Sequence, residues 1–233
     1  MVFLMNTAED PPLKEVDSGI WTLEFPFRLA GMAMERRVTI VRLRSGRVLI
    51  HSTGPFTPET VAAIRALGEP VALVEGTLFH DTFATAGRRA FPEVPYFAPG
   101  NDSAWNQGAR PLAELPERTG DEIAVEPIDG VPAAREHVVI HPDTSTAIVC
   151  DLIFNIQPPQ PVWTAFAFKY INGCYGRPGM TRLFRSMIRD KAAFRASVRR
   201  LLADHHFERL IPGHGQILSS GAMEILQDEI DRF

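Results

Sequence analysis

The sequence has little cysteine, no long apolar run and no strong excess of charge, and each absence excludes a class of protein. Two cysteines without a Cys-x-x-Cys spacing exclude a disulfide framework and favour a reducing compartment. No apolar run approaches the roughly 20 residues that a transmembrane helix needs, and the first five residues lack the basic flank of a signal peptide. The net charge of −4 gives no basic footprint for nucleic acid or a membrane surface. We therefore expect a cytoplasmic protein with a small-molecule substrate or ligand and no nucleic-acid or membrane partner. Its oligomeric state is left open.

The most informative stretch is the apolar, β-branched run Thr146–Asn155, which carries Asp151 in its middle. Such a run predicts a strand covered on both faces, where an ionised carboxylate is costly unless it is paired or bound to a metal. His214 offers a partner, because it follows a short apolar strand and stands between two glycines that permit a tight turn. His80 offers another, at the end of the apolar run Val71–His80. Three ligand-type side chains at strand ends predict a shared site, although each of them alone is more commonly structural.

The two halves of the chain repeat one plan: a hairpin, a polar turn, a helix and a strand that leads to a histidine. In the first half the hairpin is 37–51, and a helix begins at the N-cap Thr57 and ends at Gly68. In the second half the hairpin is 137–150 and ends in Asp151. The pattern predicts one domain over residues 1–233, with βα halves of about 20–120 and 121–233 stacked as a sandwich. We expect loops at 27–35 and 99–120.

The segment 156–180 places four aromatic residues between prolines and glycines: Trp163, Phe166, Phe168 and Tyr170. Two interpretations stay open, a flap over the site and an aromatic segment packed on the core. The next helical stretch is predicted to break near Asp190, a good N-cap. Its arginines, at 182, 185 and 189, are more typical of a solvated helix face than of an anion site.

At Asp151 and at Pro212–Gly215 the chain resembles the metallo-β-lactamase superfamily, and the resemblance runs from about residue 37 to residue 214. In that superfamily one strand ends in an aspartate that bridges two metal ions, and a later strand ends in a Gly-His ligand. The resemblance implies an α+β fold, a four-layer αββα sandwich with the site at one edge of its two sheets. It also implies His80, Asp151 and His214 as metal ligands, with Asp151 as the catalytic residue.

The chain departs from the superfamily in its strongest motif, a His-x-His-x-Asp-His run. The matching positions are residues 75–80, where only His80 is kept and Glu75, Thr77 and Phe79 stand at the other ligand positions. The superfamily's middle histidine, expected near residues 129–130, is also missing. Three ligands suit one catalytic ion with an open position, whereas a two-metal site needs more. We expect one zinc, iron or manganese ion, with Glu75 or Asp81 as a further donor, or no ion at all.

Three functional hypotheses follow. The first is a hydrolase with a reduced metal site that acts on an ester, thioester, lactone or phosphoester. The second is a non-catalytic binding or sensing protein that keeps the fold and has lost metal catalysis. The third, a metal-free enzyme with Ser52 or Cys150 as nucleophile, ranks last because no general base stands at a recognisable spacing.

Overall fold

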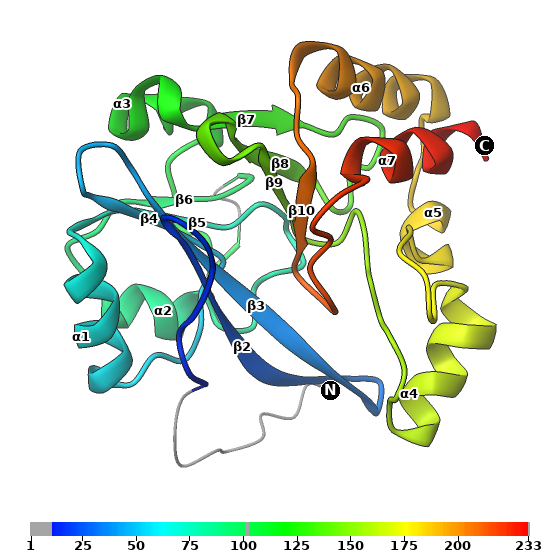
Figure 1. The fold of residues 1–233 in the computed structure, drawn as a ribbon, viewed down its shortest axis with the longest axis horizontal. Coiled ribbons are helices and arrows are strands. Elements are labelled where there is room, and N and C mark those ends of the chain that lie inside the picture. Colours follow the sequence, from blue (N-terminus) through cyan, green and yellow to red (C-terminus); the bar gives the residue numbers. More distant parts are fainter. Residues whose placement is uncertain (1–10, 101–102, 233) are drawn as a thin grey trace.

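Two β-sheets form the centre of the computed structural model, which describes residues 11–100 and 103–232 (Figure 1). The first sheet has the order β1–β2–β3–β4–β5–β6, with β1 Lys14–Asp17, β2 Ile20–Leu29, β3 Met32–Arg42, β4 Val48–His51, β5 Pro70–Val74 and β6 Tyr96–Phe97. The second has the order β10–β9–β8–β7, with β7 Ala124–Pro127, β8 His137–His141, β9 Thr146–Val149 and β10 Arg209–Pro212.

The α-helices are α1 Pro58–Leu67, α2 Ala84–Ala90, α3 Pro116–Thr119, α4 Val162–Phe166, α5 Arg182–Ser186, α6 Lys191–Asp204 and α7 Ala222–Asp231. A π-helical turn, η4 Ala167–Asn172, continues α4, and 3₁₀ turns lie at Leu112–Glu114, Gly120–Glu122 and Pro142–Thr144. No helix of the described ranges has the length and apolar character needed to cross a bilayer.

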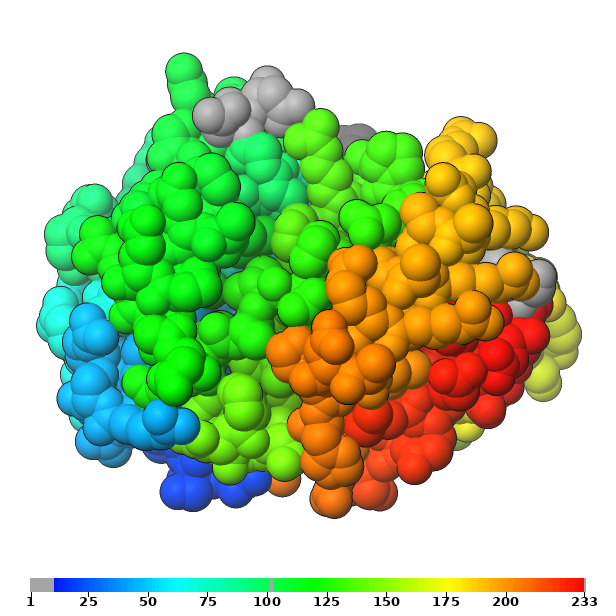
Figure 2. All heavy atoms as spheres, turned by 90° about the horizontal axis from the view of Figure 1, so that it is seen from above, coloured from blue at the N-terminus to red at the C-terminus, as the bar shows by residue number. Residues whose placement is uncertain are grey.

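Three apolar cores separate four layers. Between the sheets, Val41 of β3 belongs to the same cluster as Ile148 of β9. The outer face of the first sheet packs on α1 through Ile64, and that of the second sheet packs on α6 and α7 through Val198 and Leu226. Figure 2 shows α6 and α7 as the orange and red part of the upper face, beside the green segment around α3. The predicted α+β, four-layer αββα sandwich is confirmed.

The predicted helix signals at 57–68 and at Asp190 are confirmed. The Thr57 side chain accepts a hydrogen bond from the Thr60 backbone N–H, Pro58 begins α1, and Gly68 follows its last residue. Asp190 accepts from the N–H groups of Ala192 and Ala193 and so begins α6. These caps satisfy N–H groups that a helix leaves without partners in its first turn.

Residues 27–35 were predicted to be a loop, but they form the end of a long hairpin. β2 and β3 stay paired from Ile20 opposite Val41 to Leu29 opposite Met32, and Ala30–Gly31 turns the chain with positive φ at both residues. Ladder pairing overrides the low strand preference of methionine and alanine here. The segment 99–120 is likewise more than a surface loop, because it holds a 3₁₀ turn and α3 and buries Leu112 and Leu115.

The strand predicted to reach His80 ends at Val74. Beyond it the chain leaves the first sheet and joins the loop before β8, where His137 N–H donates to Gly76 O (2.7 Å) and Leu78 N–H to Ala134 O (2.8 Å). A side chain at position 76 would meet Cys150 Sγ at 2.9 Å, so only glycine permits this approach. The strand prediction therefore failed because backbone partners from the other half of the chain capture residues 76–78.

Candidate metal centre

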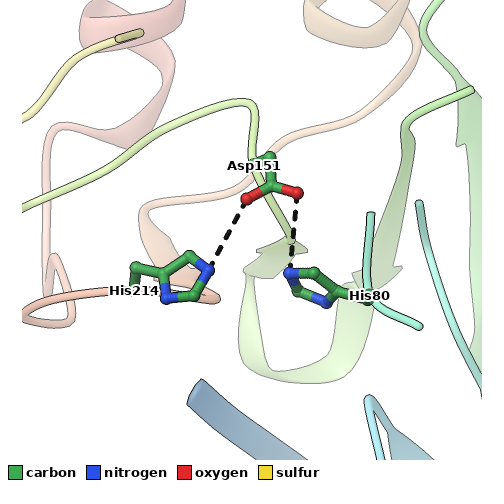
Figure 3. A group of neighbouring side chains, drawn as sticks. All are labelled: His80, Asp151 and His214. Carbon is green, nitrogen blue, oxygen red and sulfur yellow. Dashed lines mark ion pairs between the residues drawn. The ribbon is translucent and has the colours of Figure 1, made fainter. Parts of the chain in front are cut away.

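His80, Asp151 and His214 meet at one edge of the two sheets, where the predicted convergence is confirmed (Figure 3). One oxygen of the Asp151 carboxylate lies 3.6 Å from Nε2 of His80, and the other lies 3.6 Å from Nε2 of His214. One ligand atom from each of the three residues lies within 4.8 Å of the other two. Within residues 11–100 and 103–232, this is the one group of three or more such side chains with metal-site spacing.

The sequence brings the three residues together through parallel strands. β9 and β10 are parallel neighbours and end at Val149 and Pro212, so the segments that follow them leave the second sheet at the same edge. Asp151 and His214 stand two residues beyond these ends. His80 reaches the edge from the first sheet, on the loop that follows β5.

His214 is held by the backbone around it. Its Nδ1–H donates to the carbonyl of Glu35 (2.6 Å), which leaves the lone pair of Nε2 on the side of Asp151. Phe154 stacks on the imidazole with the ring centres 5.0 Å apart. Gly215, at φ +85°, has no room for a side chain, because a Cβ there would lie 2.2 Å from Asn155 O. Gly215 thus has the turn role predicted from the sequence, whereas Gly213 is needed for a close approach, because a Cβ there would lie 2.7 Å from Cys150 O.

Arg37 of β3 anchors the loop that carries His214. Its guanidinium donates to the carbonyls of Pro212 (2.7 Å) and Gly215 (2.6 Å), and its backbone N–H donates to Gly213 O (2.9 Å). A buried arginine that satisfies two carbonyls on either side of His214 fixes the position of the imidazole relative to the first sheet.

His80 is oriented by a chain of polar groups. Its Nδ1 lies 3.1 Å from the hydroxyl of Ser52, and Ser52 in turn hydrogen-bonds to the carboxylate of Glu75. With Nδ1 engaged in this way, Nε2 faces Asp151 and has no hydrogen-bond partner, although it is buried. Metal-binding histidines commonly have their other nitrogen tied to a carboxylate or hydroxyl in this manner.

The departures from the superfamily motif each have a structural role. Glu75 pairs with the buried Arg36 (3.2 Å) and accepts from Thr53 N–H (2.9 Å), and its Oε2 lies 3.8 Å from Nδ1 of His80, the ring nitrogen that does not face Asp151. The Thr77 hydroxyl donates to Ala134 O (3.0 Å). Phe79 is 41% exposed and lines a cavity beside the cluster. Of the two further donors proposed from the sequence, Glu75 is thus engaged elsewhere, and Asp81 lines the cavity.

A second buried carboxylate, Glu136, holds the loop that carries Asp151. One of its oxygens accepts from the backbone N–H groups of Cys150, Asp151 and Leu152 at 2.8–3.1 Å. Burial, together with the nearby charge of Asp151, raises the pKa of Glu136 to about 8. Glu136 therefore acts as a cap for this turn.

Burial dominates the electrostatics of the cluster. It lowers the pKa of His214 to about 4, against the opposing attraction of Asp151, and it lowers the pKa of His80 well below the usual range, with Arg36 adding to the effect. Burial also raises the pKa of Asp151, while His214 and Arg36 oppose that rise. Both imidazoles are therefore neutral at pH 7, which is the form that binds metals.

The other sequence candidates lie outside the cluster. Ser52 and Cys150 are buried and do not line the cavity, and burial raises the pKa of the Cys150 thiol well above its usual range. His51, whose pKa burial lowers to about 3, lies 3.9 Å from the Cys150 sulfur. Sequence reasoning missed Arg36 and Glu136. The signal that pointed to Asp151, a lone charge inside an apolar run, is absent at both positions, because Arg36 stands between Glu35 and Arg37, and Glu136 between Arg135 and His137.

Comparison with known proteins places the fold. No protein-family model and no curated protein matches the sequence. The structure is similar to a metallo-β-lactamase from Erythrobacter litoralis (TM-score 0.65, 15% identity, 95% of this chain and 96% of that chain covered). It is also similar to a metallo-β-lactamase from Pontibacter korlensis (TM-score 0.61, 14% identity, 95% of this chain and 99% of that chain covered). A third similar structure is that of the metallo-β-lactamase FIM-1 from Pseudomonas aeruginosa in its mono-zinc form (TM-score 0.59, 15% identity, 96% of this chain and 96% of that chain covered).

Proposed function

We propose that this chain, which has the metallo-β-lactamase fold, is a hydrolase that binds one metal ion through His80, Asp151 and His214. The observation that carries the proposal is a pair of buried atoms without hydrogen-bond partners, His80 Nε2 and an Asp151 oxygen, which face each other at 3.6 Å. Buried polar atoms are rarely left in this state. Donor atoms around a tetrahedral zinc at about 2.0–2.1 Å are about 3.4 Å apart, so the observed spacing suits ligands of one ion.

The donor set fits a single zinc, iron or manganese ion, because two neutral imidazoles and a carboxylate are ligands that all three accept. When bound, such an ion supplies a Lewis acid that polarises the substrate and lowers the pKa of water. A two-metal centre is not proposed. The positions that would supply its other ligands are occupied by Glu75, Thr77 and Phe79, and the first two are bonded elsewhere.

The residues of the chain have separate roles in hydrolysis. His80 and His214 hold the ion, and Asp151 either completes the ligand set or accepts the proton of the attacking water. The raised pKa of Asp151 brings it nearer to that of a useful general base. The oxygen of water bonds to the acyl carbon or phosphorus, the bond to the leaving oxygen or sulfur breaks, and the leaving group takes up a proton. Esters, thioesters, lactones and phosphoesters all suit this chemistry.

A non-catalytic binding or sensing protein is the second candidate, and the Arg36–Glu75 pair favours it. The buried guanidinium of Arg36 and the carboxyl of Glu75 satisfy each other in the remodelled first motif without a metal. In that case the three-residue cluster is a polar end of a binding cavity. Under both candidates we keep the prediction of a cytoplasmic protein without nucleic-acid partners.

Elemental analysis of protein purified without chelator distinguishes the hydrolase from the non-catalytic binding protein. The hydrolase predicts close to one equivalent of zinc, iron or manganese, lost in His214→Ala and Asp151→Ala and kept in the control His206→Ala, whose side chain is 74% exposed. A panel of one ester, thioester, lactone and phosphoester should show activity that disappears with both the chelator and the first two substitutions.

Thermal melts separate a ligand role from a structural one. A variant that has only lost the ion should melt at the temperature of the chelator-stripped wild type, whereas one that has lost a structural contact should melt well below it. Activity that survives both chelation and His214→Ala would end the metallohydrolase proposal.

A further inference from the structure

A cavity of about 320 Å³ opens beside the three-residue cluster, and most of the surface that lines it is apolar. The hairpin β2–β3 supplies Phe27 and Met34 on one side, while Phe154, Phe168 and Met187 supply apolar surface from the second half of the chain. Arg36, Asp151 and the histidines bring polar atoms together beside this apolar surface. A volume near the lower end of the usual 300–1,000 Å³, with an apolar body and a few polar groups, is typical of a pocket for a small amphiphile.

The side chains in the wall suit a flexible chain more than a rigid ring system. Met32, Met34 and Met187 line the cavity, and Phe154 and Phe168 form one cluster with the first two. Methionine has several rotatable bonds and adapts to the shape of its partner. Fixed aromatic faces opposite adaptable thioethers form a slot that can close on chains of different length.

The mouth of the cavity is also apolar, although it faces water. Leu29, Phe79 and Leu183 line the cavity and are nevertheless 39%, 41% and 59% exposed. α4 carries two further exposed aromatic residues, Trp163 and Phe166, whose ring centres are stacked 5.6 Å apart. Figure 1 shows α4 beside the tip of the β2–β3 hairpin, to which Trp163 Nε1–H is bonded through Ala30 O (3.0 Å). Exposed apolar residues at the mouth of a cavity are typical of a binding site.

We propose that the cavity binds an unbranched apolar acyl chain, so that the substrate is an ester or thioester of a medium- or long-chain carboxylic acid. The chain lies along the methionines and phenylalanines, and the acyl carbon lies at the three-residue cluster. The hydrolytic part rests on the function proposed above: water adds its oxygen to the acyl carbon, the bond to the leaving oxygen or sulfur breaks, and the leaving group is protonated. The binding part stands on the cavity alone.

Binding is measured first, with a probe that cannot react. The 2-alkanones of four to twelve carbons keep the chain and the carbonyl but have no leaving group. Each buried methylene contributes about 0.8 kcal/mol, so affinity should rise about fourfold per carbon until the cavity is filled. Calorimetric titration of the metal-free and metal-loaded protein should give the same dependence on length, because the proposal places the carbonyl group, and not the end of the chain, at the three-residue cluster.

Two substitutions and one matched control locate the chain. Leu183→Asp places a charge at the exposed mouth, and Met187→Trp fills the wall, so both should weaken binding of 2-decanone at least tenfold. Val162→Asp changes an apolar residue of α4 that is 88% exposed and does not line the cavity, and it should leave affinity within twofold. Leu183 lies on the surface, so its variant should keep the wild-type melting temperature even if Met187→Trp folds poorly.

Hydrolysis of 4-nitrophenyl esters from acetate to dodecanoate completes the test. A kcat/KM that rises with chain length, together with the binding series, supports both proposals. Ketone binding with the expected length dependence but no hydrolysis supports the acyl-chain site and removes the hydrolase. Hydrolysis of all lengths at one rate, or ketone affinities that do not change with length or with Leu183→Asp, would overturn the acyl-chain site.

Discussion

Replacing Arg36 by methionine removes the cation that faces Glu75, and the cost of this change should depend on pH. In the folded wild type, burial raises the pKa of Glu75 to about 7, although Arg36 opposes the rise. Without Arg36, the hydrogen bonds from Thr53 and Ser52 still favour the charged form of Glu75. We therefore expect the pKa of Glu75 in the variant to reach about 9, as documented for other buried glutamates.

The magnitude follows from proton linkage. Between pH 7 and 9 the folded variant keeps most of a proton that its unfolded chain has lost, while in the folded wild type Glu75 goes from about half ionised to almost fully ionised. A carboxyl with a raised folded-state pKa stabilises at low pH and loses that contribution as pH rises. At the steepest point, near pH 8, the variant should therefore lose about 1 kcal/mol of unfolding free energy per pH unit relative to wild type, and about 2 kcal/mol from pH 7 to 9. Near pH 6, where Glu75 is mostly protonated in both proteins, the remaining cost should be the pH-independent one of losing the hydrogen bond from Arg36 to His80 O (3.3 Å).

Urea unfolding at pH 6, 7, 8 and 9 measures this difference. Arg36→Met/Glu75→Gln lacks the titrating group, so its difference from wild type should be flat above pH 7. Arg89→Met, a change at an exposed arginine of α2, is the control for charge removal. A difference between Arg36→Met and wild type that stays constant from pH 6 to 9 would show that Arg36 does not set the ionisation of Glu75.

Three further predictions concern the ligands and their support. Ser52→Ala removes the hydroxyl that orients His80, so zinc affinity by competitive titration should fall about 10- to 100-fold with wild-type secondary structure, and unchanged affinity would contradict this role. Because burial lowers the pKa of His214 to about 4, this residue should add no pH dependence to metal affinity between pH 6 and 8; a decline centred near 6.5 in the same titration would refute it. Gly215→Ala should destabilise the protein by more than about 1 kcal/mol in urea unfolding, since its φ is positive and Asn155 O occupies the space of a Cβ; wild-type stability would contradict the close approach.

The sequence predicted those elements whose stabilising contacts lie within a few residues along the chain. The cap at Thr57 and the break at Asp190 were predictable because an N-cap acts on groups two or three residues away. The convergence of Asp151 and His214 was predictable from a carboxylate in an apolar run and a histidine between glycines. The route to His80 was not, because residues 76–78 bond to a loop some 60 residues further along the chain.

The electrostatic support of the site also depends on distant partners. Arg36 stands 39 positions before Glu75, and nothing near either residue indicates that they pair. Glu136 caps a turn 14 to 16 residues later, which is beyond the reach of any local pattern. The sequence does not show that Arg36 and Glu136 are buried. If their burial had been known, the cost of an isolated buried charge would have predicted a partner for each of them.

The hydrogen bonds between the β2–β3 hairpin and α4 have a consequence for synthesis of the chain. Ala33 N–H donates to the Thr164 hydroxyl (2.9 Å), across 131 positions of sequence. At about 5–20 residues per second, the hairpin waits about 7–26 s on the ribosome for the helix that bonds to its tip. During that interval the apolar surface around Met34 also lacks Phe168, which follows α4 in η4 and packs in the same cluster. Nascent chains should therefore engage a chaperone until residue 164 emerges, and chains truncated before it should aggregate more readily than the full-length protein.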